Sequence, residues 1–286
     1  MRCLWEKWLT KVFWLWGLDW RQLCQAMKIA CYETDVTEVQ WELIEPMLPP
    51  AKKLGRKRTS LRRILDALLY IAKAGCQWRL LPVDFPPWQT VYAMFRKWIT
   101  EGVWEVLNAR LRARVRAKAG KRCRPTAAIL DSQSVRSSAH GGEVGYDAGK
   151  MIKGRKRHIL VDTLGLLLGV KVTPASTPER AGAMLLLSPL LFWFPWLRKL
   201  WVDAGYTGPQ FADWVRGLRP KLDVEVVKRS DTAKGFQLLA HRWVVERTFG
   251  WLMRHRRLVR DHETSTSSAE TFVLIAMIRI QLRRLA

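Results

Sequence analysis

HILVDTLGLLLGVKV, at residues 158–172, is the stretch that decides the fold class. Two apolar runs of strand length flank Leu164-Gly165, and because glycine permits a tight turn there, the stretch predicts a β-hairpin. Residues 127–131 and 200–203 are further short apolar runs, and each ends at an aspartate. A helical pattern over residues 178–191 lies between these runs. Strands that alternate with helices predict a mixed α/β domain.

The chain upstream of that domain predicts helices instead. Thr37 and Gln40 have the capping-box spacing, and Thr59-Ser60 open a second helix that ends near Gly75. A later helix, which starts at about Val103, carries four arginines opposite its apolar side: Arg110, Arg112, Arg114 and Arg116. A helical module with a basic surface is typical of helix-turn-helix domains that bind DNA, and a basic surface that contacts only solvent is the alternative.

A polar, basic linker near residue 120 separates the two patterns. We therefore predict a Trp-rich N-terminal extension at residues 1–31, a helical DNA-binding domain at 32–120 and the α/β domain at 121–286. The five tryptophans of the extension favour a helix packed on the body of the protein, or an irregular extension, and interfacial membrane binding is the alternative. No apolar run approaches the roughly 20 residues that span a bilayer.

The charge indicates the class of partner. The sequence has 49 Lys and Arg against 25 Asp and Glu, which gives a formal net charge of +24. An enzyme for small neutral substrates does not need this excess, whereas a protein that lies along phosphates does, so nucleic acid is the expected partner and an anionic membrane surface the weaker alternative. The five cysteines are an odd number without C-x-x-C spacing, which argues against a disulfide framework and a Cys-rich zinc site.

Three acidic residues, Asp131, Asp203 and Glu246, are the candidate metal ligands. Asp131 and Asp203 each end a predicted strand, and the ends of adjacent strands in an open α/β sheet meet at one crevice. Glu246 lies on a predicted helix, where Arg242 is an alternative partner one turn away. Clustered carboxylates repel one another unless a cation neutralises them, and hard oxygen ligands suit Mg²⁺ or Mn²⁺. Spacing alone does not distinguish such a metal site from aspartates that end strands and bind no metal.

Several blocks of the sequence resemble the signature blocks of bacterial insertion-sequence transposases of the DDE type, and the insertion sequence five family is the most similar group. The blocks within the predicted α/β domain are residues 131–135, 145–150, 153–158, 203–206 and 242–251. Upstream, residues 37–50, 75–79 and 86–92 also look like that group. The resemblance runs from about residue 32 to the C-terminus, and several ordered blocks together are far more specific than any single one.

The resemblance implies an RNase H-like catalytic domain behind a helical DNA-binding region. It implies that Asp131, Asp203 and Glu246 are the catalytic, metal-binding triad for Mg²⁺ or Mn²⁺. Related families also place a Tyr, an Arg and a Lys around the glutamate. Arg242 matches this pattern, but Leu239 and Met253 stand at the Tyr and Lys positions, so the roles of that Tyr and Lys do not transfer to this chain.

The implied function is that of a transposase, which binds the terminal inverted repeats of its element, cleaves a strand at each end and joins the 3′ ends to target DNA. The implied partners are double-stranded DNA and further copies of this chain, as a dimer or larger assembly, with no membrane and no small-molecule cofactor. The implied location is the bacterial cytoplasm, in association with the nucleoid. The alternatives are a metal-dependent nuclease without strand transfer and a non-catalytic DNA-binding protein, either decayed or domesticated.

The basic residues near these blocks are the candidate DNA contacts, because cations beside a phosphate-cleaving site bind the DNA backbone. They are Arg56, Lys57, Arg58, Lys150, Lys153, Arg155, Lys156, Arg157, Arg242, Arg247 and Arg254. A solvated loop is the alternative for the group between residues 150 and 157. Asp147 and Asp162 lie near the site in sequence, and we expect them to have hydrogen-bonding or structural roles.

Overall fold

A computed structural model of the chain describes residues 32–50, 59–138, 142–227 and 240–286. The predicted N-terminal extension lies outside the described residues, and so does the basic linker with Arg56, Lys57 and Arg58.

The predicted helical region is present. Its elements are α3 (Glu38–Ile44), the 3₁₀ turn η1 (Glu45–Met47), α4 (Leu61–Ala74), the 3₁₀ turn η2 (Trp78–Leu80), α5 (Trp88–Thr100) and α6 (Val103–Lys118). The capping box is confirmed, since Gln40 N donates to Thr37 Oγ1 at 3.3 Å and Thr37 N donates to Gln40 Oε1 at 3.2 Å. Ser60 caps α4 at its start, and Gly75 ends it with a φ of 72°, a conformation that favours glycine.

A mixed sheet follows the helical region. Its strands are β1 (Ala127–Arg136), β2 (Gly145–Asp147), β3 (Ile152–Asp162), β4 (Leu167–Pro174), β5 (Lys199–Val202) and β6 (Asp223–Val226). Their order is β2-β3-β1-β5-β6, and β4 pairs with β3 as the second strand of the predicted hairpin. The β2, β3 and β4 pairings and the β1–β3 pairing are antiparallel, whereas β5 is parallel to both β1 and β6.

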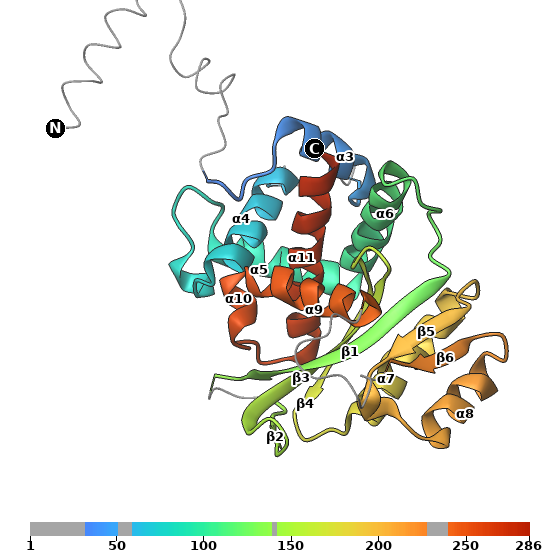
Figure 1. Cartoon of the computed structure of the whole chain (residues 1–286). Helices are drawn as coiled ribbons and strands as arrows, with labels where there is room; N and C mark the ends of the chain where they lie inside the picture. Colours follow the sequence, from blue (N-terminus) through green and yellow to red (C-terminus); the bar gives the residue numbers. More distant parts are fainter. Residues whose placement is uncertain (1–31, 51–58, 139–141, 228–239) are drawn as a thin grey trace, which may run out of the picture.

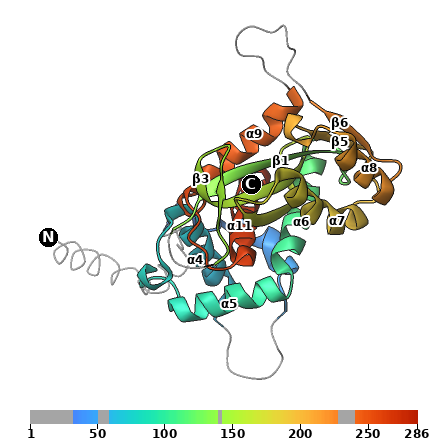
Figure 2. The same cartoon turned by 90° about the horizontal axis from the view of Figure 1, so that it is seen from below.

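Helices cover both faces of this sheet. They are α7 (Glu179–Trp193), α8 (Pro209–Leu218), α9 (Ala240–Met253), α10 (Arg256–Val259) and α11 (Thr266–Leu285), with the 3₁₀ turn η3 (Ala204–Tyr206) after β5. Figure 1 shows α9, α10 and α11 on the same side of the sheet as the helical region, with α7 and α8 on the other. Seen from below, β5, β6 and α8 lie at the end of the molecule farthest from α4 and α5 (Figure 2). The expected RNase H-like α/β fold, preceded by an all-α module, is confirmed.

Alternation along β1 divides the interior into two apolar layers. Ile129 packs into the layer that contains α4, α5, α6 and α11, whereas Ala128 and Leu130 pack into the layer under α7 and α8. Because both faces of the strand pack against helices at this end, its first four residues, Ala127 to Leu130, are all apolar.

The predicted basic side of α6 is only partly exposed. Arg110 and Arg114 are exposed, but Arg112 and Arg116 are buried, which corrects the prediction that all four form one polar surface. Arg112 donates to Leu167 O at 2.8 Å, and Arg116 pairs with Asp162 at 2.5 Å. Arg112 and Arg116 are buried because α6 packs against β4 and α11, and their side chains therefore bind groups inside the protein.

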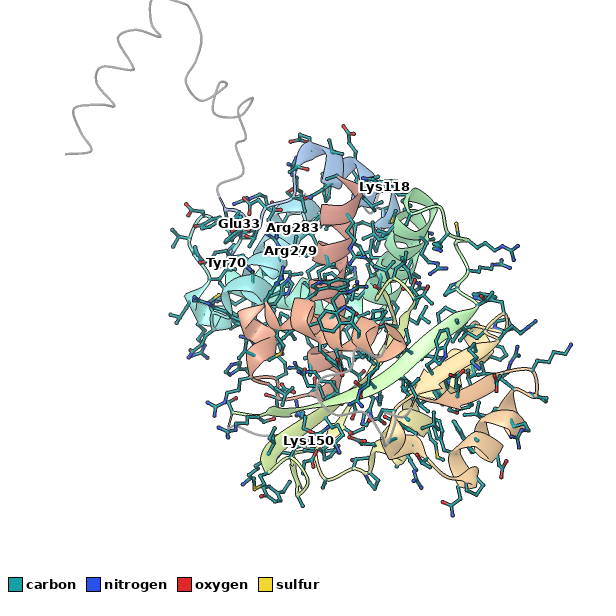
Figure 3. The ribbon with its side chains drawn as sticks, in the orientation of Figure 1. Glu33, Tyr70, Lys118, Lys150, Arg279 and Arg283 are labelled. Carbon is teal, nitrogen blue, oxygen red and sulfur yellow. The ribbon has the colours of Figure 1, made fainter. Side chains whose placement is uncertain are left out.

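The C-terminal helix ties the two ends of the described chain together. Arg283 pairs with Glu33 at 2.6 Å, and Arg279 donates to Thr34 O at 2.7 Å (Figure 3). Most of α11 is buried, including the predicted core residues Phe272, Ile275 and Leu282. Among the described residues, no helix is both long enough and apolar enough to cross a membrane.

Candidate active site

The two predicted aspartates lie at the edge where parallel strands β1 and β5 end their pairing. That pairing runs from Ala127–Lys199 to Ile129–Trp201. Asp203 directly follows β5, as predicted, and its Oδ1 accepts a hydrogen bond from Gly205 N at 3.0 Å. Asp131 was predicted to end its strand, but β1 continues to Arg136, because residues 128–136 remain paired with β3. Asp131 therefore stands inside a rigid strand.

Asp131 and Asp203 line one small pocket together with Arg242 and Val245 of α9. Burial raises the pKa of Asp131 to about 7, and the charge of Asp203 adds to this increase. Burial also raises the pKa of Asp203, with Glu179 as the next contributor. Arg242 and Lys150 oppose both increases without cancelling them. Two carboxylates of this kind favour a bound cation, because the cation would stabilise their charged forms.

Glu246 is on α9 as predicted, but its carboxylate is engaged elsewhere. Its Oε1 lies 3.1 Å from Arg242 Nε, and 46% of its side chain is exposed. Glu246 does not line the pocket of Asp131 and Asp203. Within residues 32–50, 59–138, 142–227 and 240–286, no three His, Cys, Asp or Glu side chains are grouped closely enough to hold a metal ion. The structure therefore brings together two members of the predicted triad and holds the third beside them through Arg242.

The donor atoms at this edge fit the expected metal. Carboxylate oxygens are the ligands that Mg²⁺ and Mn²⁺ prefer, and Mg²⁺ is commonly held by one or two carboxylates together with water and phosphate oxygens. Asp131 and Asp203 supply such a pair, in a pocket where burial penalises their uncompensated charge. The residues present are consistent with a divalent cation at Asp131 and Asp203.

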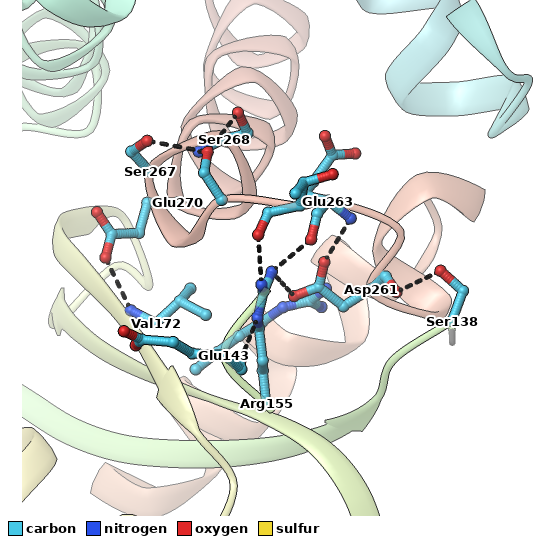
Figure 4. A network of polar contacts seen from close by, with 12 residues as sticks. Ser138, Glu143, Arg155, Val172, Asp261, Glu263, Ser267, Ser268 and Glu270 are labelled. Atoms are coloured by element: carbon cyan, nitrogen blue, oxygen red, sulfur yellow. Dashed lines mark hydrogen bonds and ion pairs between the residues drawn. The ribbon is translucent and has the colours of Figure 1, made fainter. Parts of the chain in front are cut away.

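Three of the predicted DNA contacts are buried in the protein. Arg155 is 1% exposed and binds Asp261 at 3.4 Å and the backbone carbonyls of Glu143, Glu263 and Thr264 (Figure 4). Lys156 binds Asp147 at 3.3 Å and Thr177 O at 3.2 Å, and Arg157 donates to Leu258 O at 2.7 Å. These side chains join β3 to neighbouring segments, so we do not carry them into the DNA-binding surface proposed below.

The remaining predicted contacts are more accessible. Lys150, in the turn between β2 and β3, and Lys153, the second residue of β3, are exposed, and Lys150 also pairs with Glu179 at 3.1 Å (Figure 3). Arg254 is exposed after α9, whereas Arg247 is partly buried over the Trp251 ring at 4.7 Å. As expected, Asp147 and Asp162 have hydrogen-bonding and structural roles, Asp147 with Ser134 and Lys156 and Asp162 with Arg116.

Sequence reasoning missed a groove beyond the far end of β1. Its lining includes Arg136, Lys153 and Arg260, beside the exposed side chains of Tyr146 and Met151. Within the described parts of the chain, none of the three cations has a side-chain hydrogen bond or ion pair. The groove was missed because β1 was predicted to end at Asp131. The strand continues to Arg136, and this places Arg136 in the lining of the groove.

Sequence reasoning also missed Glu179, the first residue of α7. It lies close to Asp203 although they are separated along the chain, and it accepts a hydrogen bond from Ser132 at 3.0 Å. A glutamate in the first turn of a helix is ordinarily explained by the helix dipole, so the sequence alone did not single it out.

Comparison with known proteins identifies the family of the chain. The family described as "Transposase DDE domain" matches residues 122–280, more than half of the chain, and the family described as "Putative transposase of IS4/5 family" matches residues 36–108. The "Insertion element IS402 uncharacterized 16.2 kDa protein" of Burkholderia cepacia is 35% identical over 112 residues, which are 37% of this chain and 75% of that protein. "Uncharacterized protein y4sN" of Sinorhizobium fredii is 38% identical over 71 residues, which are 24% of this chain and 57% of that protein. No solved structure matches significantly. The chain therefore belongs to the DDE transposases of bacterial insertion sequences.

Proposed function

We propose that this transposase binds the terminal inverted repeats of its own insertion sequence, cleaves DNA there and joins the 3′ ends to target DNA. The observation that carries the proposal is the shared pocket of Asp131 and Asp203 at the carboxyl end of the parallel strands. Divalent cations bound there would supply an activated water and neutralise charge that develops on the cleaved phosphate. Asp131 and Asp203 hold the site on rigid strands, and Glu246 completes the triad once its carboxylate leaves Arg242.

The exposed cations are proposed to hold the DNA backbone. Arg136, Lys153 and Arg260 line one groove with Tyr146 and Met151, which are 56% and 74% exposed. Cations without protein partners are free to bind phosphates, and an exposed aromatic ring beside them offers a surface for a base or a sugar. Arg254, Arg110 and Arg114 are further exposed cations, and Arg242 is partly exposed, so we include these four as additional candidate contacts with the DNA backbone.

The assembly is proposed to contain at least two copies of this chain. One described chain carries one Asp131–Asp203 pocket, whereas transposition must process two ends of the element together. Cleavage at both ends by a dimer or larger complex on DNA satisfies that requirement.

A nicking and joining assay tests the function. The substrate is a duplex with the element's own end, and the wild type is compared with Asp203→Asn in Mg²⁺ and in EDTA. We expect cutting at the end and joining to target DNA in Mg²⁺, with both lost in the variant and in EDTA. Asp213→Asn is the matched control, since Asp213 is an exposed aspartate of α8 paired with Arg216.

The same assay separates the two alternatives. Cutting without joined products indicates a metal-dependent nuclease, and tight binding without cutting in either Mg²⁺ or Mn²⁺ indicates a non-catalytic DNA-binding protein. Near-normal cutting by Asp203→Asn contradicts the proposed site itself.

A further inference from the structure

Glu179 reaches the catalytic edge from the opposite face of the sheet to α9. It is the first residue of α7, and its Oε1 accepts hydrogen bonds from Ser132 Oγ at 3.0 Å and from Lys150 Nζ at 3.1 Å. Ser132 directly follows Asp131 on β1, so its backbone position is as fixed as that of the predicted ligand. The Glu179 carboxylate is therefore held beside the active site by two donors.

The other oxygen of Glu179 faces Asp203. A Cβ atom placed on Gly205 would lie 2.6 Å from Glu179 Oε2 and 3.1 Å from Asp203 Oδ1. Both oxygens thus lie close to the same point, on the outside of the turn that follows β5. The missing side chain of Gly205 leaves the space through which these two carboxylates approach each other.

The hydroxyl of Tyr206 is a second, independent sign of an incomplete site. Tyr206 is 1% exposed, and its hydroxyl makes no hydrogen bond within the described residues. Its charged neighbours are Asp131, Glu179 and Asp203, and Ser132 interacts with it without reaching normal hydrogen-bond geometry. A buried hydroxyl without a partner is unfavourable, and a ligand or its water molecules would supply the missing hydrogen bond.

Among the described residues, the negative charge around Asp203 is only partly compensated. Glu179 adds to the negative charge at Asp203, and Arg242 and Lys150 oppose it. Arg242 also pairs with Glu246, and Lys156, which acts on Glu179 as well, pairs with Asp147, so Lys150 is the main compensating cation at Glu179. A divalent cation bound by these carboxylate oxygens would neutralise the remaining negative charge.

We propose that Glu179 is a further ligand for a divalent cation at Asp203, in addition to the predicted triad. This inference rests on the proposed function, because it adds a carboxylate to the same site. Glu179 Oε2 is at the end of a flexible side chain, so rotation of that side chain would bring it to a cation bound at Asp203. Lys150 then leaves Glu179 and becomes available to a DNA phosphate, which links cation binding to DNA binding.

The test measures binding of Mn²⁺ alone to the DNA-free, full-length protein by calorimetry. Glu179→Gln keeps the shape of the side chain and removes its charge, and we expect Mn²⁺ affinity to fall by about 10-fold or more, within the range found when partners around a metal are removed. Glu270→Gln is the matched control, since Glu270 also accepts from one lysine, at 3.1 Å, and from one further donor, Val172 N, at 2.9 Å (Figure 4). Equal affinity of Glu179→Gln and Glu270→Gln overturns the inference.

A second pair of variants keeps the test independent of Glu179 itself. Gly205→Ala places a methyl group against Glu179 Oε2 and should weaken Mn²⁺ binding, and because the displaced atom ends a flexible side chain, the fold should persist. Gly217→Ala is the control, since a Cβ there meets nothing within 4 Å. Unchanged affinity in Gly205→Ala contradicts the inferred approach of the two carboxylates.

Variants of the aspartates separate this inference from the proposed function. If Asp131→Asn and Asp203→Asn lose Mn²⁺ while Glu179→Gln does not, Glu179 is not a ligand and the proposed site stands. If none of the three variants changes Mn²⁺ binding, both proposals fail.

Discussion

Arg242 lies one helical turn before Glu246 on α9 and pairs with it, with 3.1 Å between Arg242 Nε and Glu246 Oε1. The same arginine lines the pocket of Asp131 and Asp203, and its charge opposes the increase in the pKa of both aspartates. A single guanidinium group therefore interacts electrostatically with all three members of the expected triad. Because it places a positive charge where the proposed metal ion would act, we expect it to compete with the ion in the DNA-free protein.

The first prediction concerns this competition. Arg242→Gln should tighten Mn²⁺ binding to the DNA-free protein several-fold, because the competing charge is removed, and should reduce DNA cleavage, because a phosphate contact is lost. Arg242→Lys keeps the charge and should bind Mn²⁺ much as the wild type does. Calorimetry and the cleavage assay measure the two effects. Weaker Mn²⁺ binding in Arg242→Gln would show that the arginine supports the ion rather than competes with it.

The second prediction concerns pH. Burial and Asp203 raise the pKa of Asp131 from 3.8 to about 7, so the folded protein holds a proton that the unfolded chain releases. The free energy of unfolding should therefore fall as pH rises from about 4 to about 7, at a cost of up to about 1.4 kcal/mol per pKa unit. Asp131→Asn removes this cost, so its Tm should exceed that of the wild type at pH 8 but not at pH 4.

The matched controls for the pH prediction are Asp213→Asn and added Mg²⁺. Asp213 is exposed, and its replacement should leave the pH dependence of the Tm unchanged. At pH 8, Mg²⁺ should raise the Tm of the wild type more than that of Asp131→Asn, because the ion stabilises the charged carboxylate. A difference in Tm between Asp131→Asn and the wild type that does not vary with pH argues against a perturbed Asp131.

The fold and the position of Asp203 at the end of a strand were predictable because local patterns specify them, whereas the strand of Asp131 continues to Arg136. The run on each side of Leu164-Gly165 became the β3–β4 hairpin, and the end of a short apolar strand placed Asp203 correctly. Burial of basic residues was not predictable from these patterns. The sequence suggests that Arg155 is a cation in a solvated loop, yet it binds Asp261 and the carbonyl groups of Glu263 and Thr264 as well as Glu143 O. The segment with Asp261, Glu263 and Thr264 lies between α10 and α11, so its approach to Arg155 depends on the packing of those helices. Glu179 was missed for the same reason, because only the tertiary structure brings α7 to Asp203.

The third prediction concerns one of these buried arginines. Arg116 of α6 pairs at 2.5 Å with Asp162, whose other oxygen accepts from Leu164 N and Leu166 N in the hairpin turn. Arg116→Met leaves a buried carboxylate without its charge partner, which should lower the free energy of unfolding by about 3–5 kcal/mol. Arg114→Met, an exposed position on the same helix, should change it by less than about 0.5 kcal/mol. Urea unfolding measures both, and equal effects would mean that the pair does not connect α6 to the sheet.

The fourth prediction concerns the groove of Arg136, Lys153 and Arg260. Each cation that binds a phosphate contributes about 0.9 to the slope of log K against log salt, because its binding releases counterions from duplex DNA. Arg136→Ala and Lys153→Ala should each weaken binding to a duplex with the element's end and reduce the slope by about that amount. Arg216→Ala is the control, since Arg216 is 66% exposed but already paired with Asp213 at 2.6 Å. All three changes remove one exposed positive charge, so general electrostatic attraction predicts equal slopes for the three variants. A smaller slope for the groove variants alone can arise only if DNA contacts that groove.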